Sequence, residues 1–317
     1  MKHEEKIRLP DEIILIEPPE YGWPWSSAIF AVRDEKGCTL IEVGCGGEKA
    51  VKHTLSSLHE RGVAPGTVHT ILISHAHPDH YGAIRQIIEI HPEAEIVIHE
   101  NELAAASGIE GLYRNFDFHL GAKYTGSRGP DLDFAIEQRK QGIFMDACHA
   151  GAHPPHRTAA DGEITAAGPL RLKWMLTPGH SPGHTVFYDS AHGLLFSGDL
   201  VGKHPAWYAP TAGGVSGYLA GLDAIAALRP AVLLPSHGRP VTDPQKIISS
   251  IRDKLIQRED RILDMLSEGP SSFRRIVAAL FPDHYRLFPG CPIVESHLLK
   301  LAGEGKIVES DNAYALS

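Results

Sequence analysis

Three histidines and one aspartate fall within six residues, in the segment Ser74-His75-Ala76-His77-Pro78-Asp79-His80. Imidazole nitrogens and carboxylate oxygens are donors that zinc accepts in proteins. Alternate residues of an extended segment point the same way, so His75 and His77 can face one metal ion. Asp79 and His80 follow a turn and can face a second position. Four such donors without a ligand would be costly to crowd together, which favours a metal site over a polar loop.

Three more donors, His180, Asp199 and His237, lie far along the chain. Each follows an apolar run, in the segments Met-Leu-Thr-Pro-Gly-His180, Leu-Phe-Ser-Gly-Asp199 and Leu-Leu-Pro-Ser-His237. A single histidine after a strand is weak evidence. Here, however, four segments share the order of buried strand, turn and donor. Open α/β folds place their ligand sites at the carboxyl ends of strands, so we expect the seven donors to meet.

The elements that must position these donors alternate between strand and helix. Short runs rich in branched residues predict strands at 12–17, 28–33, 38–43, 68–73, 95–99, 170–176, 184–189, 193–197 and 231–235. Helices are expected at 47–62 and 80–91. This alternation predicts an α/β layer architecture for a catalytic domain over residues 1–245. Residues 101–165 break the rhythm and are interpreted as a helical insertion, a kind of segment that is often functional.

The tail, residues 246–317, has a different pattern. An amphipathic helix is expected over Lys246–Ser267 and ends at Gly269-Pro270. Shorter helices over Ser271–Leu280 and Ile293–Gly303 and a hairpin after Lys306 complete the outline of a winged helix. We therefore expect a small second domain.

Composition narrows the function. The chain has 317 residues, a formal net charge of −9 and 20 histidines. The net negative charge does not favour a polyanionic partner such as RNA. The four cysteines form no C-x-x-C pair, so a cysteine zinc site is not indicated. The polar start shows no signal peptide and no run of 18 apolar residues occurs, which predicts a cytoplasmic protein without membrane contact.

The combined pattern H-x-H-x-D-H, then P-G-H, S-G-D and a late H-G, resembles the metallo-β-lactamase superfamily over residues from about 12 to 240. The resemblance implies a four-layer αββα sandwich and two divalent metal ions, with zinc suiting the donors and iron or manganese also compatible. It implies one metal held by His75, His77 and His180. It implies a second held by Asp79, His80 and His237, with Asp199 bridging.

The same resemblance implies a hydrolase that uses a metal-bound hydroxide, with Asp79 as the catalytic residue that orients the nucleophile or passes a proton. Lactam-hydrolysing members generally lack an aspartate at the position of Asp199, and di-iron oxygen-reducing members carry a glutamate where His77 stands. The pattern is most similar to glyoxalase-II-type thioesterases, lactonases and metal-dependent nucleases. A thioester or ester substrate is therefore expected, with a lactonase as one alternative.

The other alternative is an endoribonuclease. A metallo-β-lactamase domain with a C-terminal winged helix resembles the lactamase-beta-like subgroup, which includes an endoribonuclease and polyketide-type thioesterases. The tail has ten Lys and Arg and ten Asp and Glu from residue 246 onward, and helix 293–303 carries only Lys300. A nucleic-acid module normally shows a basic face. We therefore expect a small-molecule acyl substrate and a tail used for docking, dimerisation or pocket closure, although Arg274, Arg275, Arg286 and Lys306 keep the RNA alternative open.

Substrate contacts are predicted from the neighbourhood of the donors. Trp207 and Tyr208 follow Asp199 closely and suit an apolar ligand wall. His184 follows His180 and is either a substrate contact or a residue that orients the ligands. Apolar and aromatic residues of the insertion could cover an acyl chain: Leu112, Tyr113, Phe116, Phe118, Phe134, Ile143 and Phe144.

Overall fold

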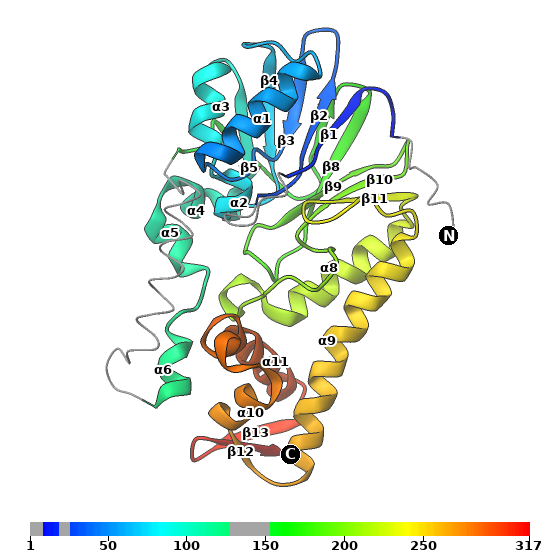
Figure 1. Ribbon diagram of the computed structural model, residues 1–317. Coiled ribbons are helices and arrows are strands. Elements are labelled where there is room, and N and C mark those ends of the chain that lie inside the picture. Colours follow the sequence, from blue (N-terminus) through cyan, green and yellow to red (C-terminus); the bar gives the residue numbers. More distant parts are fainter. Residues whose placement is uncertain (1–8, 19–25, 127–152) are drawn as a thin grey trace, which may run out of the picture.

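The computed structural model describes residues 9–18, 26–126 and 153–317, and its larger part is built on two β-sheets packed face to face (Figure 1). The first sheet has the order β1 (Ile13–Ile16), β2 (Ile29–Arg33), β3 (Cys38–Ile41), β4 (Val68–Ile73), β5 (Glu95–His99) and β6 (Arg157–Ala159). Its strands run antiparallel from β1 to β3 and parallel from β3 to β6. The carboxyl ends of the parallel strands β3 to β6 therefore lie at the same edge of this sheet.

The second sheet has the order β11 (Val232–Pro235), β10 (Leu194–Gly198), β9 (Thr185–Asp189), β8 (Leu170–Leu176) and β7 (Ile164–Ala167). Only the β10–β11 pair of this sheet is parallel. Large apolar side chains from both inner faces, including Phe30, Trp174, Phe187 and Phe196, form the core between the sheets.

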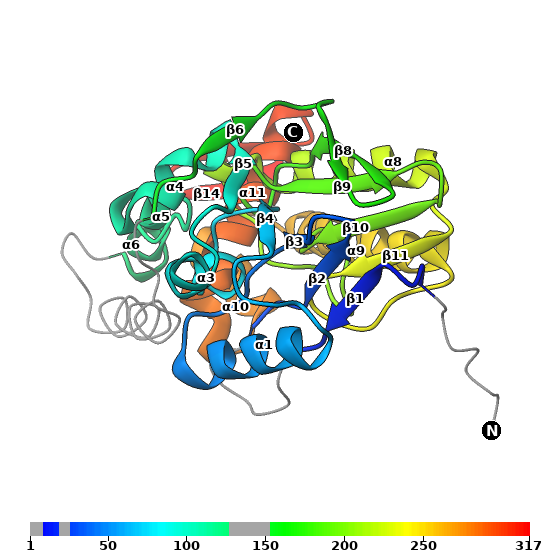
Figure 2. The ribbon, with the colours of Figure 1, turned by 90° about the horizontal axis from the view of Figure 1, so that it is seen from above.

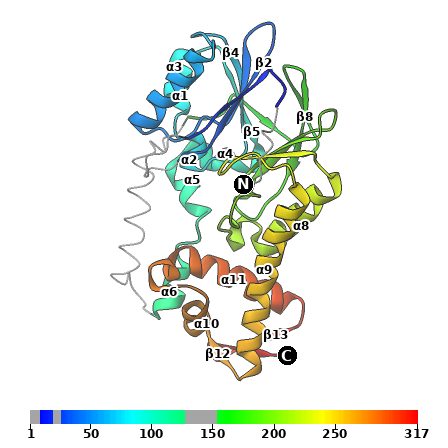
Figure 3. The same cartoon turned by 45° about the vertical axis from the view of Figure 1, so that its right-hand side comes forward.

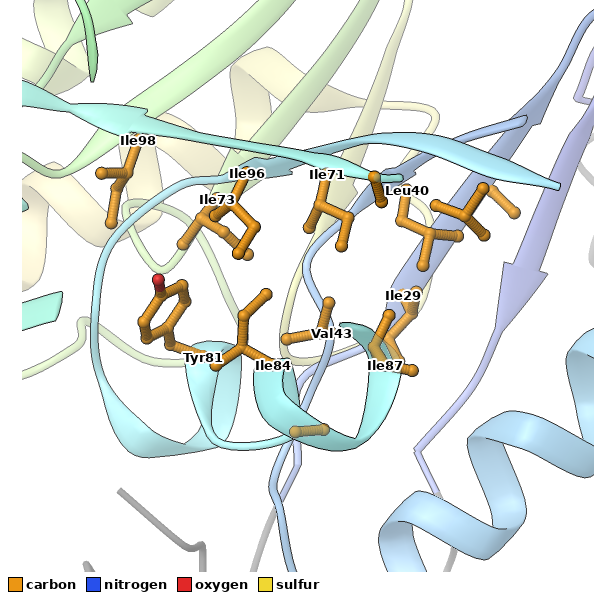
Figure 4. Close-up of a cluster of buried hydrophobic side chains, with 14 of the residues drawn as sticks. Ile29, Leu40, Val43, Ile71, Ile73, Tyr81, Ile84, Ile87, Ile96 and Ile98 are labelled. Carbon is orange, nitrogen blue, oxygen red and sulfur yellow. The ribbon is translucent and has the colours of Figure 1, made fainter. Parts of the chain in front are cut away.

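Helices cover the two outer faces (Figure 2). On the first sheet lie α1 (Glu48–Glu60) and α3 (Ile84–Ile90). Figure 4 shows Ile84 and Ile87 of α3 facing Ile71, Ile73 and Ile96 of the sheet. On the second sheet lies α8 (Gly214–Leu228), and the first turns of α9 (Pro244–Ser267) pack against it. The α/β layering predicted from the sequence is thus confirmed.

Three local expectations differ from the structure. The helix expected over residues 80–91 is divided into α2 (Pro78–Tyr81) and α3. The range 101–165 begins with the short helices α4 (Leu103–Ser107), α5 (Ile109–Arg114) and α6 (Leu120–Thr125), but its end contributes β6 and β7 to the two sheets. Residues 127–152 of that range, with Phe134 and Phe144, lie outside the described residues. Helix α8 was not predicted.

The C-terminal part contains α9, β12 (Ser271–Ser272), α10 (Phe273–Leu280), α11 (Cys291–Gly303), β13 (Ile307–Ser310) and β14 (Ala313–Leu316). Its three strands form a small sheet in the order β12-β14-β13. It has a core of its own, which includes Ile276, Val294, Leu298 and Tyr314. In Figures 1 and 3 this part lies beyond α8, with α6 beside α10 and α11.

Within the described ranges, no helix has both the length and the apolar character needed to cross a lipid bilayer.

Candidate metal centre

The seven predicted donors converge at one end of the sandwich. Each follows the carboxyl end of a strand: His75 and His77 lie in the loop after β4, Asp79 and His80 in the short helix α2 that continues this loop, and His180, Asp199 and His237 in the loops after β8, β10 and β11. Their ligand atoms fall into three overlapping groups, each within 4.8 Å: His75, His77 and His180; His75, His80 and Asp199; Asp79, His80 and His237. The first and the third of these groups are the ones that the family resemblance assigned to two separate metals.

Asp199 lies between the first group and the third group. Its Oδ2 is 3.3 Å from Nε2 of His180, and its Oδ1 is 3.2 Å from Nε2 of His80 and 3.5 Å from Nε2 of His237. One carboxylate therefore reaches donors of both groups, which is the geometry that a bridging ligand needs.

The donor set fits a metal pair better than a hydrogen-bonded network. Among the described residues, the buried atoms His77 Nε2, Asp199 Oδ1 and both ring nitrogens of His80 have no partner in hydrogen-bonding geometry. Buried polar atoms of native proteins nearly always have such a partner. Nitrogen and oxygen atoms that are buried, close together and unsatisfied are the ligands expected for divalent cations such as zinc.

The ionisation of four of the donors suits metal binding, whereas the carboxylates of Asp199 and Asp79 raise the pKa values of His80 and His237 in spite of burial, so these two rings must release a proton when a metal binds. Burial, reinforced by the charges of neighbouring histidines, lowers the pKa of His75 and of His77 well below the usual range, so both rings are neutral. Burial opposes the ionisation of Asp79, but His80 and His237 outweigh it and lower the pKa to about 2. The same two histidines hold the pKa of Asp199 well below its usual range in spite of burial. Neutral imidazole and ionised carboxylate are the forms that bind metals.

Neighbouring groups orient two of the rings. Nδ1 of His180 lies 2.7 Å from the carbonyl oxygen of Trp207, and Nδ1 of His75 lies 2.9 Å from Oγ of Ser74. A carbonyl can only accept, so His180 carries its proton on Nδ1 and presents a bare Nε2 to the site. Hydrogen bonds of this kind fix the tautomer and the orientation of metal-binding histidines.

Glu42 is a functional residue that the sequence reasoning missed. The strand expected over 38–43 ends at Ile41, and Glu42 has a left-handed φ of 65°. Its Oε1 accepts a bond from the backbone N–H of Ser74 at 3.3 Å, and its Oε2 is 3.6 Å from Nδ1 of His80. Glu42 therefore holds the first donor loop behind the metal site. A carboxylate at the end of a strand was the signal that could have found it.

Glu102, also missed, joins two donor loops. This fully buried carboxylate accepts bonds from the N–H groups of Ala76, at 3.0 Å, and Gly183, at 2.7 Å, and from Oγ of Ser181, at 2.6 Å. Burial raises the pKa of Glu102, and the three donated bonds oppose that rise. A Cβ at Gly183 would lie 2.7 Å from Cγ of Glu102, so the contact requires glycine. Glu102 thereby fixes the loop of His75 and His77 against the loop of His180.

Replacing Glu102 with alanine is expected to lower the free energy of unfolding by about 2–4 kcal/mol, because two buried N–H groups lose their acceptor. Metal affinity should fall by about tenfold or more, since the two donor loops lose their connection. Urea unfolding of the metal-free protein and zinc titration measure the two effects. The neighbouring exposed Glu100→Ala is the matched control. Equal metal affinity in both variants would contradict the role given to Glu102.

Of the three residues considered for substrate contact, His184 has the orienting role that the sequence left open, and Tyr208 needs correction. His184 is fully buried; its Nε2 accepts the N–H of Asp199 at 3.0 Å, and its Nδ1 lies 2.9 Å from Oγ1 of Thr177. Burial and the neighbouring His180 lower its pKa to about 3, so the ring is neutral and positions Asp199. Tyr208 is also fully buried, and its hydroxyl bonds His297 and Arg258. Neither side chain is available to a substrate.

Trp207, the third predicted contact, lies beside the donors. Its ring stacks on that of His77 with centroids 5.3 Å apart, and on that of Phe116 at 4.9 Å. Phe288, from the C-terminal part, lies 5.1 Å from Trp207, and Phe118 stacks on Phe116 at 5.3 Å. These four rings are called the aromatic wall below. A surface cavity of about 670 Å³ continues from Phe118 and is lined by Tyr113, Arg114, Asp117, His119 and Thr211 as well.

Comparison with known proteins identifies the family. A family model described as the metallo-beta-lactamase superfamily matches residues 22–237. The chain belongs to the metallo-β-lactamase superfamily. Its hydrolytic character agrees with the similarity to a probable metallo-hydrolase, YqjP, of Bacillus subtilis, which is 24% identical over 309 residues and is covered over 94% of each chain. The chain is a metal-dependent hydrolase of this superfamily.

Two further relatives extend the likeness to the C-terminal part. A crystal structure of the metallo-beta-lactamase family protein TTHA1429 from Thermus thermophilus superposes with a TM-score of 0.73 at 24% identity, over 96% of this chain and 99% of that one. An atrochrysone carboxyl ACP thioesterase of Pseudocercospora fijiensis is 21% identical over 288 residues, covering 88% of this chain and 70% of the relative. At these identities the structural likeness establishes the fold alone.

Proposed function

We propose that this protein hydrolyses thioesters or esters that carry a bulky apolar or aromatic acyl group, with two divalent metal ions, most simply zinc. The observation that carries the proposal is the aromatic wall, which lies directly against the donor His77. An acyl group whose carbonyl reaches the donors would lie along the partly exposed ring of Trp207. Aromatic side chains offer large apolar contact areas, and pockets for small molecules combine such walls with a few polar groups.

The seven donors would hold the metals as the family pattern implies, with His75, His77 and His180 at one position, Asp79, His80 and His237 at the other, and Asp199 shared. Metals bound there would lower the pKa of a water molecule and polarise a carbonyl oxygen. Asp79 is ionised and only 17% of its side chain is exposed. Its carboxylate can accept a proton from the attacking water and return it to the leaving sulfur or oxygen as the bond to the carbonyl carbon breaks.

A known relative supports this substrate class. The atrochrysone carboxyl ACP thioesterase named above is similar along most of this chain. That relative is an ACP thioesterase by name, so thioester cleavage is the feature that it would share with the reaction proposed here. The proposal for this chain extends only to the class of acyl group.

The C-terminal part weighs against a nuclease. We infer a winged-helix-like arrangement for it from the order α10, α11, β13 and β14. Lys300, the basic residue of α11, is bonded to Glu259 at 2.8 Å and to Glu304 at 2.7 Å. Arg286 pairs with Asp283 and bonds two backbone carbonyls. Charges neutralised in this way offer little to phosphates, whose binding depends on free Lys and Arg.

A paired assay tests the proposal. The zinc-loaded protein receives a panel of acyl thioesters, esters and lactones beside a single-stranded RNA, with His77→Ala as the blank. We expect aromatic acyl thioesters or esters to be cleaved, the RNA to remain intact, and the blank to be inactive. RNA cleavage that the blank lacks, with the acyl panel intact, would overturn the proposal in favour of a nuclease. Preferential cleavage of lactones would show that the substrate is a cyclic ester and not an open-chain ester or thioester.

A further inference from the structure

We propose that Tyr208 and His297 are positioning residues for the metal centre, through which the C-terminal part sets the orientation of His180. The inference rests on the metal centre proposed above. Its starting point is the bond from Nδ1 of His180 to the carbonyl oxygen of Trp207. That carbonyl belongs to the peptide group between Trp207 and Tyr208. Because a peptide group is planar, a fixed position for Tyr208 limits the rotation of the carbonyl that holds His180.

The proton positions around Tyr208 follow from its partners. Oε1 of Glu259 lies 3.3 Å from Nδ1 of His297 and is a carboxylate oxygen that accepts, so Nδ1 carries the ring proton. Burial lowers the pKa of His297, so the ring is neutral and its Nε2 accepts the hydroxyl proton of Tyr208 at 2.6 Å. NH1 of Arg258 donates to the same hydroxyl oxygen at 2.9 Å. Lys300 donates to the other oxygen of Glu259.

The hydrogen bonds of this network therefore all run in one direction, and each bond has a donor and an acceptor. Tyr208 and His297 are both fully buried, and Arg258, Glu259, His297 and Lys300 all belong to α9 or α11 of the C-terminal part. A buried network that is fully satisfied gives its members a single geometry. This hydrogen bonding fixes the position of Tyr208, and the fixed Tyr208 limits the orientation of the adjacent peptide group.

The backbone beside Tyr208 reinforces the link. The N–H of Ala209 donates to the carbonyl of Gly179 at 3.1 Å, so residues 207–209 run along the loop that presents His180. Tyr218 of α8 holds the segment that leads from Asp199 to Trp207: its hydroxyl donates to the carbonyl of Leu200 at 2.8 Å and accepts from the N–H of Ala206 at 3.1 Å. The segment between Asp199 and Tyr208 is thus fixed by Tyr218 and by the hydrogen bonds of Tyr208. The C-terminal part provides the partners of Tyr208.

The test uses Tyr208→Phe, which removes one hydroxyl and keeps the ring. His297→Asn, which removes the acceptor of that hydroxyl, is the second variant. Tyr314→Phe is the control, because it removes another buried hydroxyl, bonded to Lys123 at 2.5 Å, in the C-terminal sheet. Zinc affinity is measured by competition with a chromophoric chelator, and the geometry of the site by the visible absorption of the cobalt(II)-loaded protein.

Tyr208→Phe and His297→Asn are expected to weaken zinc binding by about tenfold and to shift the cobalt(II) spectrum, since groups that orient a metal-binding histidine have effects of this size. Tyr314→Phe should lower thermal stability and leave both measurements unchanged. If the two variants lower thermal stability but bind zinc as the unmodified protein does, their role is structural and the inference is wrong. If the unmodified protein itself binds no metal, the proposed function fails instead.

Discussion

Replacing Asp199 with alanine is expected to remove most of the catalytic activity and at least one metal ion. Asp199 is the carboxylate that approaches His80, His180 and His237, so under the proposed assignment its loss would remove the ligand that the two metals share. Without a metal-activated water, kcat/KM should fall by about 10³-fold or more, because the pKa of water returns toward its bulk value. Steady-state kinetics and metal analysis of the purified variant measure both effects.

The control for Asp199 is Asp223→Ala. Asp223 is an exposed carboxylate of α8 that pairs with Arg252 on the surface, and exposed pairs contribute little to stability. This variant should keep its metals and its kcat/KM. An Asp199→Ala protein that retained two metals per chain and at least a tenth of the activity would show that the centre does not use Asp199 as a bridge.

Replacing Trp207 with alanine is expected to raise KM for aromatic acyl thioesters by about 10- to 100-fold, which corresponds to losing the burial of one large aromatic side chain. The carbonyl of residue 207 remains, so the bond to His180 can persist and kcat should change less. An acetyl thioester, too short to cover the aromatic wall, should be affected little. Phe288→Ala should act in the same direction with a smaller effect, because Phe288 contacts Trp207 and not the donors.

The matched control for the wall is Leu299→Ala, since Leu299 is a large apolar residue that is 54% exposed on α11. It should leave KM unchanged for every acyl group. A Trp207→Ala variant that lost acetyl and aromatic substrates equally would mean that Trp207 supports the metal site and does not select the acyl group. The aromatic wall would then no longer support the proposed substrate class.

The sequence predicted that the seven candidate donors meet, because the signal of each one is local. Each follows an apolar strand and a turn, and parallel strands must bring such positions to one edge. Glu42 and Glu102 escaped because single carboxylates are common after strands, and their bonds cross 32 residues in one case and 79 in the other. Only the folded chain shows that Glu102 has three donors around it.

Adjacent residues in an extended segment point to opposite sides, which explains why Trp207 lies at the site and Tyr208 does not. The sequence had suggested that Trp207 and Tyr208 form one apolar wall together. Helix α8 was missed because its glycines weaken the helical signal. A Cβ at Gly217 would lie 2.9 Å from the carbonyl of Pro178, and one at Gly221 would lie 3.0 Å from Cβ of Thr177. Those glycines let the helix approach the loop before His180, a requirement of packing that no periodicity reveals.

The position of Phe288 has a consequence for how this enzyme can be divided or recombined. A chain truncated near residue 245 would retain all seven donors and both large sheets, and by sequence it would be called a whole catalytic module. It would lack Phe288, and Tyr208 would lose His297 and Arg258 as partners. If the aromatic wall binds the acyl group as proposed, the functional unit extends beyond the sandwich. Exchange of C-terminal parts between relatives would be a route to new acyl selectivity without any change at the metal ligands.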